Sequence, residues 1–435
     1  MKKGFLVVLL AALFALTLPV VYKSFPIVRA KESFRAGFPR DSFLKKLNQP
    51  APMWMREQIA SDFEERKFDA LALEKTYWHL CQKTNSCYHY RILDNKLYKF
   101  VAAGAHFSPT DSSFEKAFKT LLIYAQVPDV DFILCSMDGV PEPYMPPGFF
   151  LTENVRDQAT ILAQAKLKNP FAKYIALIPD QFSLNAEWGR IAQEILELNN
   201  QIEWIQKKEI AIWRGGLTDT GLPNGELVSN LASCPRFNLS KKSLISPSSI
   251  NAGLNWAAQE MECILQKEGV MKGGISRREH LLCKYLPVLD GHMCTYPGYQ
   301  WRLLSNSLCF KQESDQIQWF YSALKPYVHY VPIQNDTNDL LGKIEWAKSH
   351  DEQVVEISKR AQEFALKNLL LEDNYLYLYL VLQKQASLEE IDFARLKKET
   401  KEDPQWKCIQ YRKRLDLMKS FHRIWNKIPK RLTTN

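Results

Sequence analysis

Three short stretches of the chain combine charged side chains with glycine or proline turns, as ligand-binding loops often do. The first is "FILCSMDGVPEP", in which Asp138 follows an apolar run and leads into Gly139 and Pro141. Open α/β sheets bind ligands outside the carboxyl ends of their strands, where we expect Asp138 to lie. A carboxylate there can take a proton from an attacking hydroxyl group. Asp138 is therefore a candidate general base, and a loop-capping aspartate is the alternative.

The second stretch, "AIWRGGLTDTG", delivers Arg214 and Gly215 at the end of another apolar run. Glycine lets backbone N–H groups approach phosphate oxygens, and a guanidinium offers two parallel donors to an anion. The spacing matches neither a P-loop nor the GxGxxG of dinucleotide folds. We interpret Arg214 with Gly215 and Gly216 as a candidate diphosphate site and Thr218 as a further candidate donor-binding residue; a turn with a surface arginine is the alternative.

The third stretch is "DGHMCTYPGYQWRLLSNSLCFKQES", which starts at Asp290. Pro297 and Gly298 turn the chain, and the helix predicted after them carries Arg302 in its first turns. A helix N-terminus beside an arginine favours anions. Lys311 follows the apolar "SLCF". Two separated cations around a glycine turn fit a nucleotide diphosphate better than a single carboxylate, and chance surface charges are the alternative.

Elements of two kinds alternate around these stretches. Short apolar runs that end in Asp, Pro or Gly predict buried parallel strands, and longer amphipathic segments between them predict helices. This alternation favours an α/β fold with right-handed crossovers. Two series of runs predict two sheets with a junction near Gln206–Glu209, hence domains at residues 31–207 and 208–385. Residues from about Lys31 to Lys99 predict a helical entry region.

Both chain ends carry signals for membranes. An apolar run of about 17 residues, Phe5 to Val21, follows Lys2 and Lys3. It predicts a signal anchor or signal peptide at residues 1–30, with the uncleaved anchor favoured and its orientation undecided. A large share of the net charge of +9 lies in residues 386–435, a predicted basic helical extension that packs on the body or contacts an anionic membrane. Because no nucleic-acid-binding motif accompanies this charge, we expect no nucleic-acid partner.

The nine cysteines include no CxxC pair, the spacing of many zinc and redox sites. Cys81 and Cys87 have a spacing that permits a small disulfide loop in an oxidising compartment. Cys135 lies within an apolar run and is interpreted as a small buried hydrophobe. The cysteines are compatible with both an oxidising and a reducing compartment.

The strings "DGHMCTYPGYQWRLLSNSLCFKQES", "QWFYSALKPYVHYVPI" and "DLLGKIEWAKSHDE" resemble the signature region of glycosyltransferase family 90. This family includes protein O-glucosyltransferases, fungal capsule xylosyltransferases and bacterial lipopolysaccharide-modifying enzymes. The resemblance covers about Glu209 to Leu371 and is weaker from Leu122 to Arg190. It implies a glycosyltransferase-B fold of two Rossmann-like domains, with a UDP-sugar donor in the second. It also implies inverting transfer to a glycan, glycolipid or protein, with no cofactor and no metal.

The resemblance also implies roles for individual residues. Asp138 matches the family's catalytic aspartate. The donor-binding positions that we carry over from the three stretches are Arg214, Gly215, Thr218, Tyr299, Gln300, Trp301, Arg302, Ser307 and Lys311. The chain departs from the family pattern at Leu217, where some members have arginine, and at Gln318, where an acidic residue is frequent.

Two other functions are compatible with the sequence. Asp129 and Asp131 form a DxD triplet, the motif with which another class of glycosyltransferases holds a divalent metal. The departures at Leu217 and Gln318 suit a sugar- or membrane-binding protein that keeps the fold with weakened catalysis.

Overall fold

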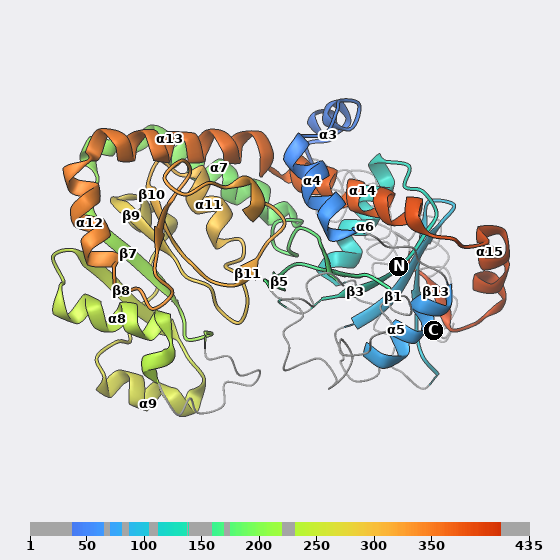
Figure 1. Cartoon of the computed structure of the whole chain (residues 1–435), viewed down its shortest axis with the longest axis horizontal. Coiled ribbons are helices and arrows are strands. Elements are labelled where there is room, and N and C mark those ends of the chain that lie inside the picture. Colours follow the sequence, from blue (N-terminus) through green and yellow to red (C-terminus); the bar gives the residue numbers. More distant parts are fainter. Residues whose placement is uncertain are drawn as a thin grey trace, which may run out of the picture.

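The computed structural model describes residues 37–64, 70–80, 87–103, 112–136, 138, 159–168, 175–219 and 231–409. The predicted anchor at residues 1–30 and most of the predicted basic extension, from residue 410 onward, lie outside these ranges. Among the described residues, no helix has both the length and the apolar character needed to span a bilayer. The chain forms two lobes, each around its own β-sheet (Figure 1). The predicted α/β fold with two sheets is confirmed.

The second lobe contains a five-stranded parallel sheet in the order β12-β10-β9-β7-β8. Its strands are β7 (Lys208–Gly216), β8 (Ile250–Trp256), β9 (Cys283–Val288), β10 (Leu308–Gln312) and β12 (Val331–Ile333). The strand order reverses between β7 and β9, because the chain adds β8 on one side of β7 and the later strands on the other. Ligands of such sheets bind outside the carboxyl ends of the strands at this switch point.

Helices cover both faces of this sheet. Side chains of a strand alternate between the faces, so Ala211 and Trp213 of β7 pack in one apolar layer and Ile212 in the other. The helices of this lobe are α8 (Pro235–Ile245), α9 (Gln259–Lys267), α10 (Arg277–Leu281), α11 (Gly298–Leu304), α12 (Leu340–Ser349) and α13 (Asp351–Asn368). α11 lies between β9 and β10 in the chain, so its first residue follows the carboxyl end of β9.

The first lobe contains a six-stranded mixed sheet in the order β13-β2-β1-β3-β4-β6. Its strands are β1 (Cys87–Leu93), β2 (Lys96–Phe100), β3 (Val130–Cys135), β4 (Ile161–Ala163), β6 (Ile175–Leu177) and β13 (Trp406–Cys408). β3, β4 and β6 are parallel, as expected of a Rossmann-like domain. The β1, β2 and β13 side is antiparallel, which the sequence did not predict.

The hairpin of β1 and β2 corrects part of the predicted helical entry region. That region does contain α3 (Arg40–Leu47), α4 (Met53–Asp62) and α5 (Ala70–Leu80). After them, Asp94 and Asn95 adopt positive φ angles of 50° and 57°. Two residues with positive φ form the tight turn that suits a two-residue hairpin. The chain therefore reverses as strands where the pattern of charges indicated helix.

The C-terminal part of the chain returns to the first lobe. α14 (Leu371–Leu388) packs against α3 and β3, and β13 pairs with β2. In Figure 1 the orange-red α14 and α15 (Phe393–Glu402) lie among the blue and teal elements of the first lobe. The helix α6 (Ser113–Tyr124) also lies on this side, whereas the connecting α7 (Ala186–Gln201) contacts α10 and α11 of the second lobe, where Figure 1 labels it. The predicted limits of 208–385 and 386–435 therefore do not coincide with the ends of the second lobe's elements.

The cysteine prediction falls only partly on the described residues. Cys81 lies outside them, so its pairing with Cys87 stays a prediction. Cys87 is at the start of β1, directly opposite Cys135 of β3 in the antiparallel register. Cys135 is buried, as expected.

Candidate active site

Arg236 joins the carboxyl ends of β7 and β9 at the switch point. Its guanidinium donates to the carbonyl oxygens of Gly216 at 2.8 Å, Leu289 at 2.9 Å and Asp290 at 2.9 Å. It also donates to Thr218 Oγ1 at 2.7 Å. These bonds hold the two strand ends in register around a buried positive charge. Thr218, a predicted donor ligand, is thereby placed at the switch point.

Arg302 is a second buried arginine at this edge, and no carboxylate among the described residues pairs with it. Its side chain is 5% exposed and points back to the start of α11, where Nη1 donates to Gly298 O at 2.9 Å. The guanidinium lies 4.2 Å from the centre of the Trp301 ring, and Nε has no partner in the described structure. Burial lowers the pKa of Arg302 to about 10, so the group stays charged at neutral pH. An unpaired buried cation of this kind favours an anionic ligand.

Two further residues of α11, Tyr299 and Gln300, bury polar atoms. Both side-chain amide atoms of Gln300 and the hydroxyl of Tyr299 lack partners in the described part of the chain. His280 packs edge-on against Trp301, with ring centres 5.5 Å apart. Burial and the charge of Arg302 lower the pKa of His280 to about 4, so its imidazole is neutral at pH 7. Buried polar groups rarely lack hydrogen-bond partners. We therefore expect a bound ligand or water molecules to supply the missing partners along α11.

Arg214 does not lie free at the switch point. Its Nε donates to Gly273 O at 3.1 Å, and its Nη atoms donate to Asn251 O at 2.9 Å and Asn251 Oδ1 at 3.0 Å. These bonds fasten β7 to β8 and the segment after it. A Cβ on Gly215 would lie 2.5 Å from the Trp213 ring, so this glycine is required for packing beside an aromatic ring. The geometry gives both residues a structural role and does not show them facing a diphosphate.

Lys311 and Ser307 also differ from the predicted arrangement. Lys311 lies at the carboxyl edge, but its Nζ is buried against Asp290 Oδ2 at 2.9 Å, so its charge is compensated. Ser307 immediately precedes β10 and is therefore at the opposite edge of the sheet. Its hydroxyl accepts from Lys207 Nζ at 2.9 Å and donates to Cys283 O at 2.9 Å. Ser307 is thus not brought together with the other predicted donor residues.

Asp138 lies three residues after β3, at the carboxyl end of that strand as predicted. It is exposed, and its backbone oxygen accepts a hydrogen bond from the hydroxyl of Tyr296 in the second lobe. Burial raises the pKa of Tyr296, and the charges of Cys294, Asp138, Asp180 and Asp290 raise it further. This contact places the candidate base of the first lobe beside the segment that leads into α11.

The DxD pair lies at the other end of β3. Asp129 contacts Lys397 Nζ at 2.6 Å, and the buried Asp131 pairs with His89 and with Arg91 Nε at 2.9 Å. Both carboxylates are thus engaged by cationic or imidazole groups, and neither lies near Asp138. In the described ranges, no group of three or more His, Cys, Asp or Glu side chains has a metal-binding arrangement.

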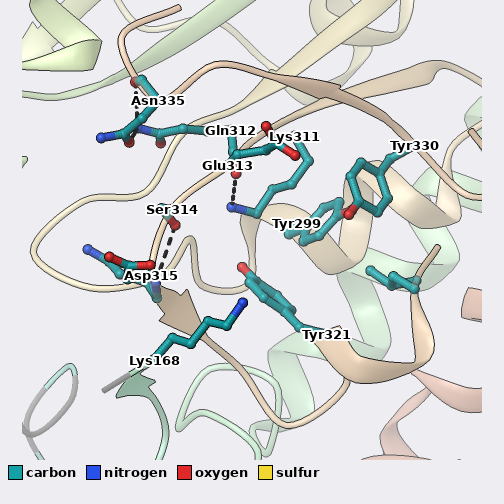
Figure 2. Close-up of a pocket in the computed structure, with 12 residues that line it drawn as sticks. Lys168, Tyr299, Lys311, Gln312, Glu313, Ser314, Asp315, Tyr321, Tyr330 and Asn335 are labelled. Atoms are coloured by element: carbon teal, nitrogen blue, oxygen red, sulfur yellow. Dashed lines mark hydrogen bonds between the residues drawn. The ribbon is translucent and has the colours of Figure 1, made fainter. Parts of the chain in front are cut away.

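A pocket of about 550 Å³ opens beside the carboxyl ends of β10 and β12 (Figure 2). Tyr299 and Lys311 are among its lining residues, and the short ladder of β5 (Lys166–Leu167) and β11 (Gln316–Ile317) bridges the lobes beside it. Tyr299 of the pocket wall lies one helical turn before Arg302 in α11, so the pocket and the Arg302 site share this helix.

Asp180, which the sequence analysis missed, follows β6 at the carboxyl edge of the first sheet. It is fully buried; Oδ1 accepts from the N–H groups of Phe182 at 3.0 Å and Ser183 at 2.9 Å, while Oδ2 has no partner among the described residues. Burial raises the pKa of Asp180 from 3.8 to about 6. The signal for it was an aspartate directly after the apolar "YIALIP", the same signal that indicated Asp138.

The raised pKa of Asp180 predicts a pH dependence of stability. The folded protein holds this proton more tightly than the unfolded chain, so the contribution of Asp180 to stability is greatest below about pH 4 and is lost as pH rises through about 6. The full difference corresponds to ~3 kcal/mol. Asp180→Asn keeps the Oδ1 acceptor and cannot ionise. Urea titrations from pH 4 to 7 should therefore show that Asp180→Asn gains stability relative to wild type as pH rises. The exposed Asp41→Asn is the control and should keep the same difference from wild type at every pH. If Asp180→Asn also keeps a constant difference in the free energy of unfolding, the raised pKa of Asp180 is contradicted.

Gly298 is the position at which a single methyl group should disturb the anion site. A Cβ there would lie 2.9 Å from Arg302 Nη1 and 2.4 Å from Thr295 Cγ2. Thr295→Ser removes that Cγ2 and keeps the Oγ1 that donates to Leu289 O at 2.6 Å. We expect the double variant Thr295→Ser/Gly298→Ala to bind UDP about tenfold more weakly than Thr295→Ser, since one charge-assisted bond is displaced. Equal dissociation constants in calorimetry would show that Arg302 has another position available.

The two departures from the family pattern are both buried. Leu217 packs in the apolar layer of the second lobe, and its N–H donates to Trp256 O at 2.8 Å. Gln318 donates from Nε2 to Thr295 O at 3.2 Å and Tyr321 Oη at 3.1 Å. Gln318 therefore braces the loop before α11 and the wall of the pocket.

Two solved structures match part of this chain at low scores. One is a glycosyltransferase from Rickettsia africae, with a TM-score of 0.36, 11% identity and coverage of 57% of this chain and 70% of that one. The other is Anabaena Alr3699/HepE in complex with UDP and glucose, with a TM-score of 0.33, 10% identity and coverage of 53% and 62%. At these scores the likeness carries no weight of its own.

Sequence relatives are closer. Mouse protein O-glucosyltransferase 3 is 36% identical over 190 residues, which make up 43% of this chain and 34% of the mouse protein. Rat protein O-glucosyltransferase 1 is 27% identical over 188 residues, 43% of this chain and 44% of the rat protein. The match thus spans less than half of either relative. The sequence profile described as Glycosyl transferase family 90 matches residues 183–424, more than half of the chain. The matched region contains the whole second lobe and the C-terminal elements α14 to β13 that pack on the first lobe. The chain therefore belongs to glycosyltransferase family 90.

Proposed function

We propose that this glycosyltransferase moves a hexose or pentose from a UDP-sugar to a hydroxyl group, with inversion at the anomeric carbon. The observation that supports this most strongly is Arg302, a buried cation with an unpartnered Nε beside the switch point of a parallel sheet. A diphosphate would supply the missing negative charge. Membership of family 90 supports the same donor, because the resemblance to this family implies a UDP-sugar and the matched residues, 183–424, include Arg302.

The chemistry follows from the two lobes. Asp138 accepts the proton of the acceptor hydroxyl while its oxygen attacks the anomeric carbon. The bond between that carbon and the UDP oxygen breaks, and UDP leaves with the electron pair. Arg302 stabilises the negative charge that develops on the leaving group, an effect commonly worth several kcal/mol in a water-poor site. No metal ion or cofactor is required in this scheme.

The acceptor is proposed to be a glycan, a glycolipid or a protein. The names of the mouse and rat relatives support a protein acceptor. We propose further that the N-terminal segment attaches the enzyme to a membrane, or directs it to the secretory pathway or periplasm if it is cleaved, and that the basic C-terminal segment contacts that membrane.

Thermal shift measurements with UDP-glucose, UDP-xylose and UDP-galactose test the donor, because a ligand stabilises the folded protein in proportion to its affinity. Hydrolysis of the same compounds tests for turnover. We expect at least one of them to raise the melting temperature and to be hydrolysed or transferred in EDTA. Stabilisation without any turnover would favour the sugar-binding protein, and turnover abolished by EDTA would favour a metal-dependent enzyme.

A further inference from the structure

The pocket beside β10 and β12 differs in charge from the Arg302 site next to it. Its charged lining residues are Lys168, Lys311, Glu313 and Asp315, two cations and two anions. Lys311 already pairs with Asp290, which does not line the pocket. A diphosphate would therefore meet two carboxylates here and little free positive charge. The pocket does not suit the charged part of a nucleotide sugar.

Its composition suits a neutral ring with several hydroxyl groups. Carboxylates accept hydrogen bonds from hydroxyls, and aromatic rings cover the apolar faces of such rings. Figure 2 shows Tyr299, Tyr321 and Tyr330 on one side of the pocket, with Ser314 and Asp315 across from them. Both Glu313 and Asp315 are exposed and so available to a ligand.

Among the described residues of the first lobe, Lys168 lines this pocket. The backbone holds it there: Leu167 of β5 pairs with Gln316 of β11, and Lys168 N donates to Asp315 O at 2.6 Å. In Figure 2 its side chain extends toward Tyr321. Lys168 has no ion pair in the described part of the chain, so its ammonium group has donors to offer.

We propose that this pocket binds the neutral polyol part of the nucleotide sugar, with Glu313 and Asp315 accepting hydrogen bonds from its hydroxyls and Lys168 donating from the opposite lobe. The proposal rests on the proposed function, because it assumes a UDP-sugar whose diphosphate lies at Arg302. The polyol is the transferred sugar or the ribose, which share this chemistry. Because residues of both lobes line the pocket, binding of the ligand favours the arrangement in which the two lobes are in contact.

Calorimetry with UDP and UDP-glucose on the full chain tests this assignment. Glu313→Gln and Lys168→Gln should each weaken UDP-glucose about tenfold, the loss expected for one hydrogen bond to a charged group. If UDP affinity is unchanged, the pocket holds the sugar; if UDP weakens equally, it holds the ribose. Both results support a polyol site.

Two exposed residues outside the pocket supply matched controls. Glu345→Gln and Lys359→Gln should bind both ligands as wild type does, with melting temperatures confirming that all four variants fold. Wild-type affinity for UDP and UDP-glucose in both pocket variants would overturn the polyol site alone. Failure of wild type to bind UDP or UDP-glucose would instead overturn the donor proposed above, and this inference with it.

Discussion

Asp138→Asn is expected to reduce sugar transfer by about a hundred- to ten-thousand-fold, the range that a general base contributes. The amide has nearly the shape of the carboxylate but cannot accept the proton of the attacking hydroxyl. Asp138 is exposed, and Tyr296 contacts its backbone oxygen, which the substitution leaves in place. We therefore expect the fold and the affinity for UDP to stay unchanged. Transfer rates at saturating donor, together with UDP dissociation constants, measure the two effects separately.

Asp129→Asn is the matched control for this variant. It removes a carboxylate at the other end of the same strand, where Asp129 pairs with Lys397. A surface ion pair contributes about 0–1 kcal/mol, so we expect wild-type turnover. The opposite pattern, with Asp138→Asn active and Asp129→Asn inactive, would move the chemistry to the DxD pair.

Arg302→Met is expected to raise the stability of the protein while it weakens the binding of UDP. The side chain is buried and has no carboxylate partner among the described residues, so its charge costs free energy in the folded protein without ligand. Methionine has a similar length and no charge, and replacement of even a buried ion pair by apolar residues often stabilises by ~1–4 kcal/mol. The same change removes the cation proposed to meet the diphosphate. We expect a higher free energy of unfolding and UDP affinity at least ~100-fold lower, as for two lost charge-assisted hydrogen bonds.

Lys207→Met is the control for Arg302→Met, because it also removes a buried positive charge from the second lobe but at a different place. Lys207 is also buried in the second lobe, and burial lowers its pKa to about 8. It contacts Ser307 at the opposite edge of the sheet. Urea unfolding and calorimetry on both variants should show that only Arg302→Met loses UDP. A parallel loss in both would mean that UDP binding follows the packing of the whole sheet.

The sequence predicted those features that depend on local pattern. Apolar runs followed by polar turns identified β3, β7, β9 and β10 and placed Asp138 and Arg302 at carboxyl ends or just beyond them. The assumption that failed was that a charged residue near a strand end faces the ligand. Arg214 instead uses its donors on β8, and Ser307 lies at the amino end of β10, because strand direction decides which edge a residue occupies.

Residues whose role depends on distant partners could not be predicted. Arg236 is in the first turn of α8, and its role appears only when Gly216 and Leu289 are brought together across β7 and β9. The sole local signal was Pro235, which suits the first position of a helix. Tyr296 likewise becomes notable only through its contact with Asp138 in the other lobe. Such contacts depend on tertiary structure that spacing along the chain does not encode.

The return of α14 and β13 to the first lobe affects the order in which the protein can be made. The second lobe is continuous from β7 to α13, so it can be completed as soon as residue 368 has been synthesised. The first lobe begins earlier in the chain but lacks its helix α14 and its edge strand β13 until residue 408 is made. Ribosomes add about 5–20 residues per second, so the earlier lobe waits for tens of seconds with an open sheet edge. Protection of that edge during synthesis is then a requirement for producing the enzyme, and fragments that end before α14 are expected to aggregate.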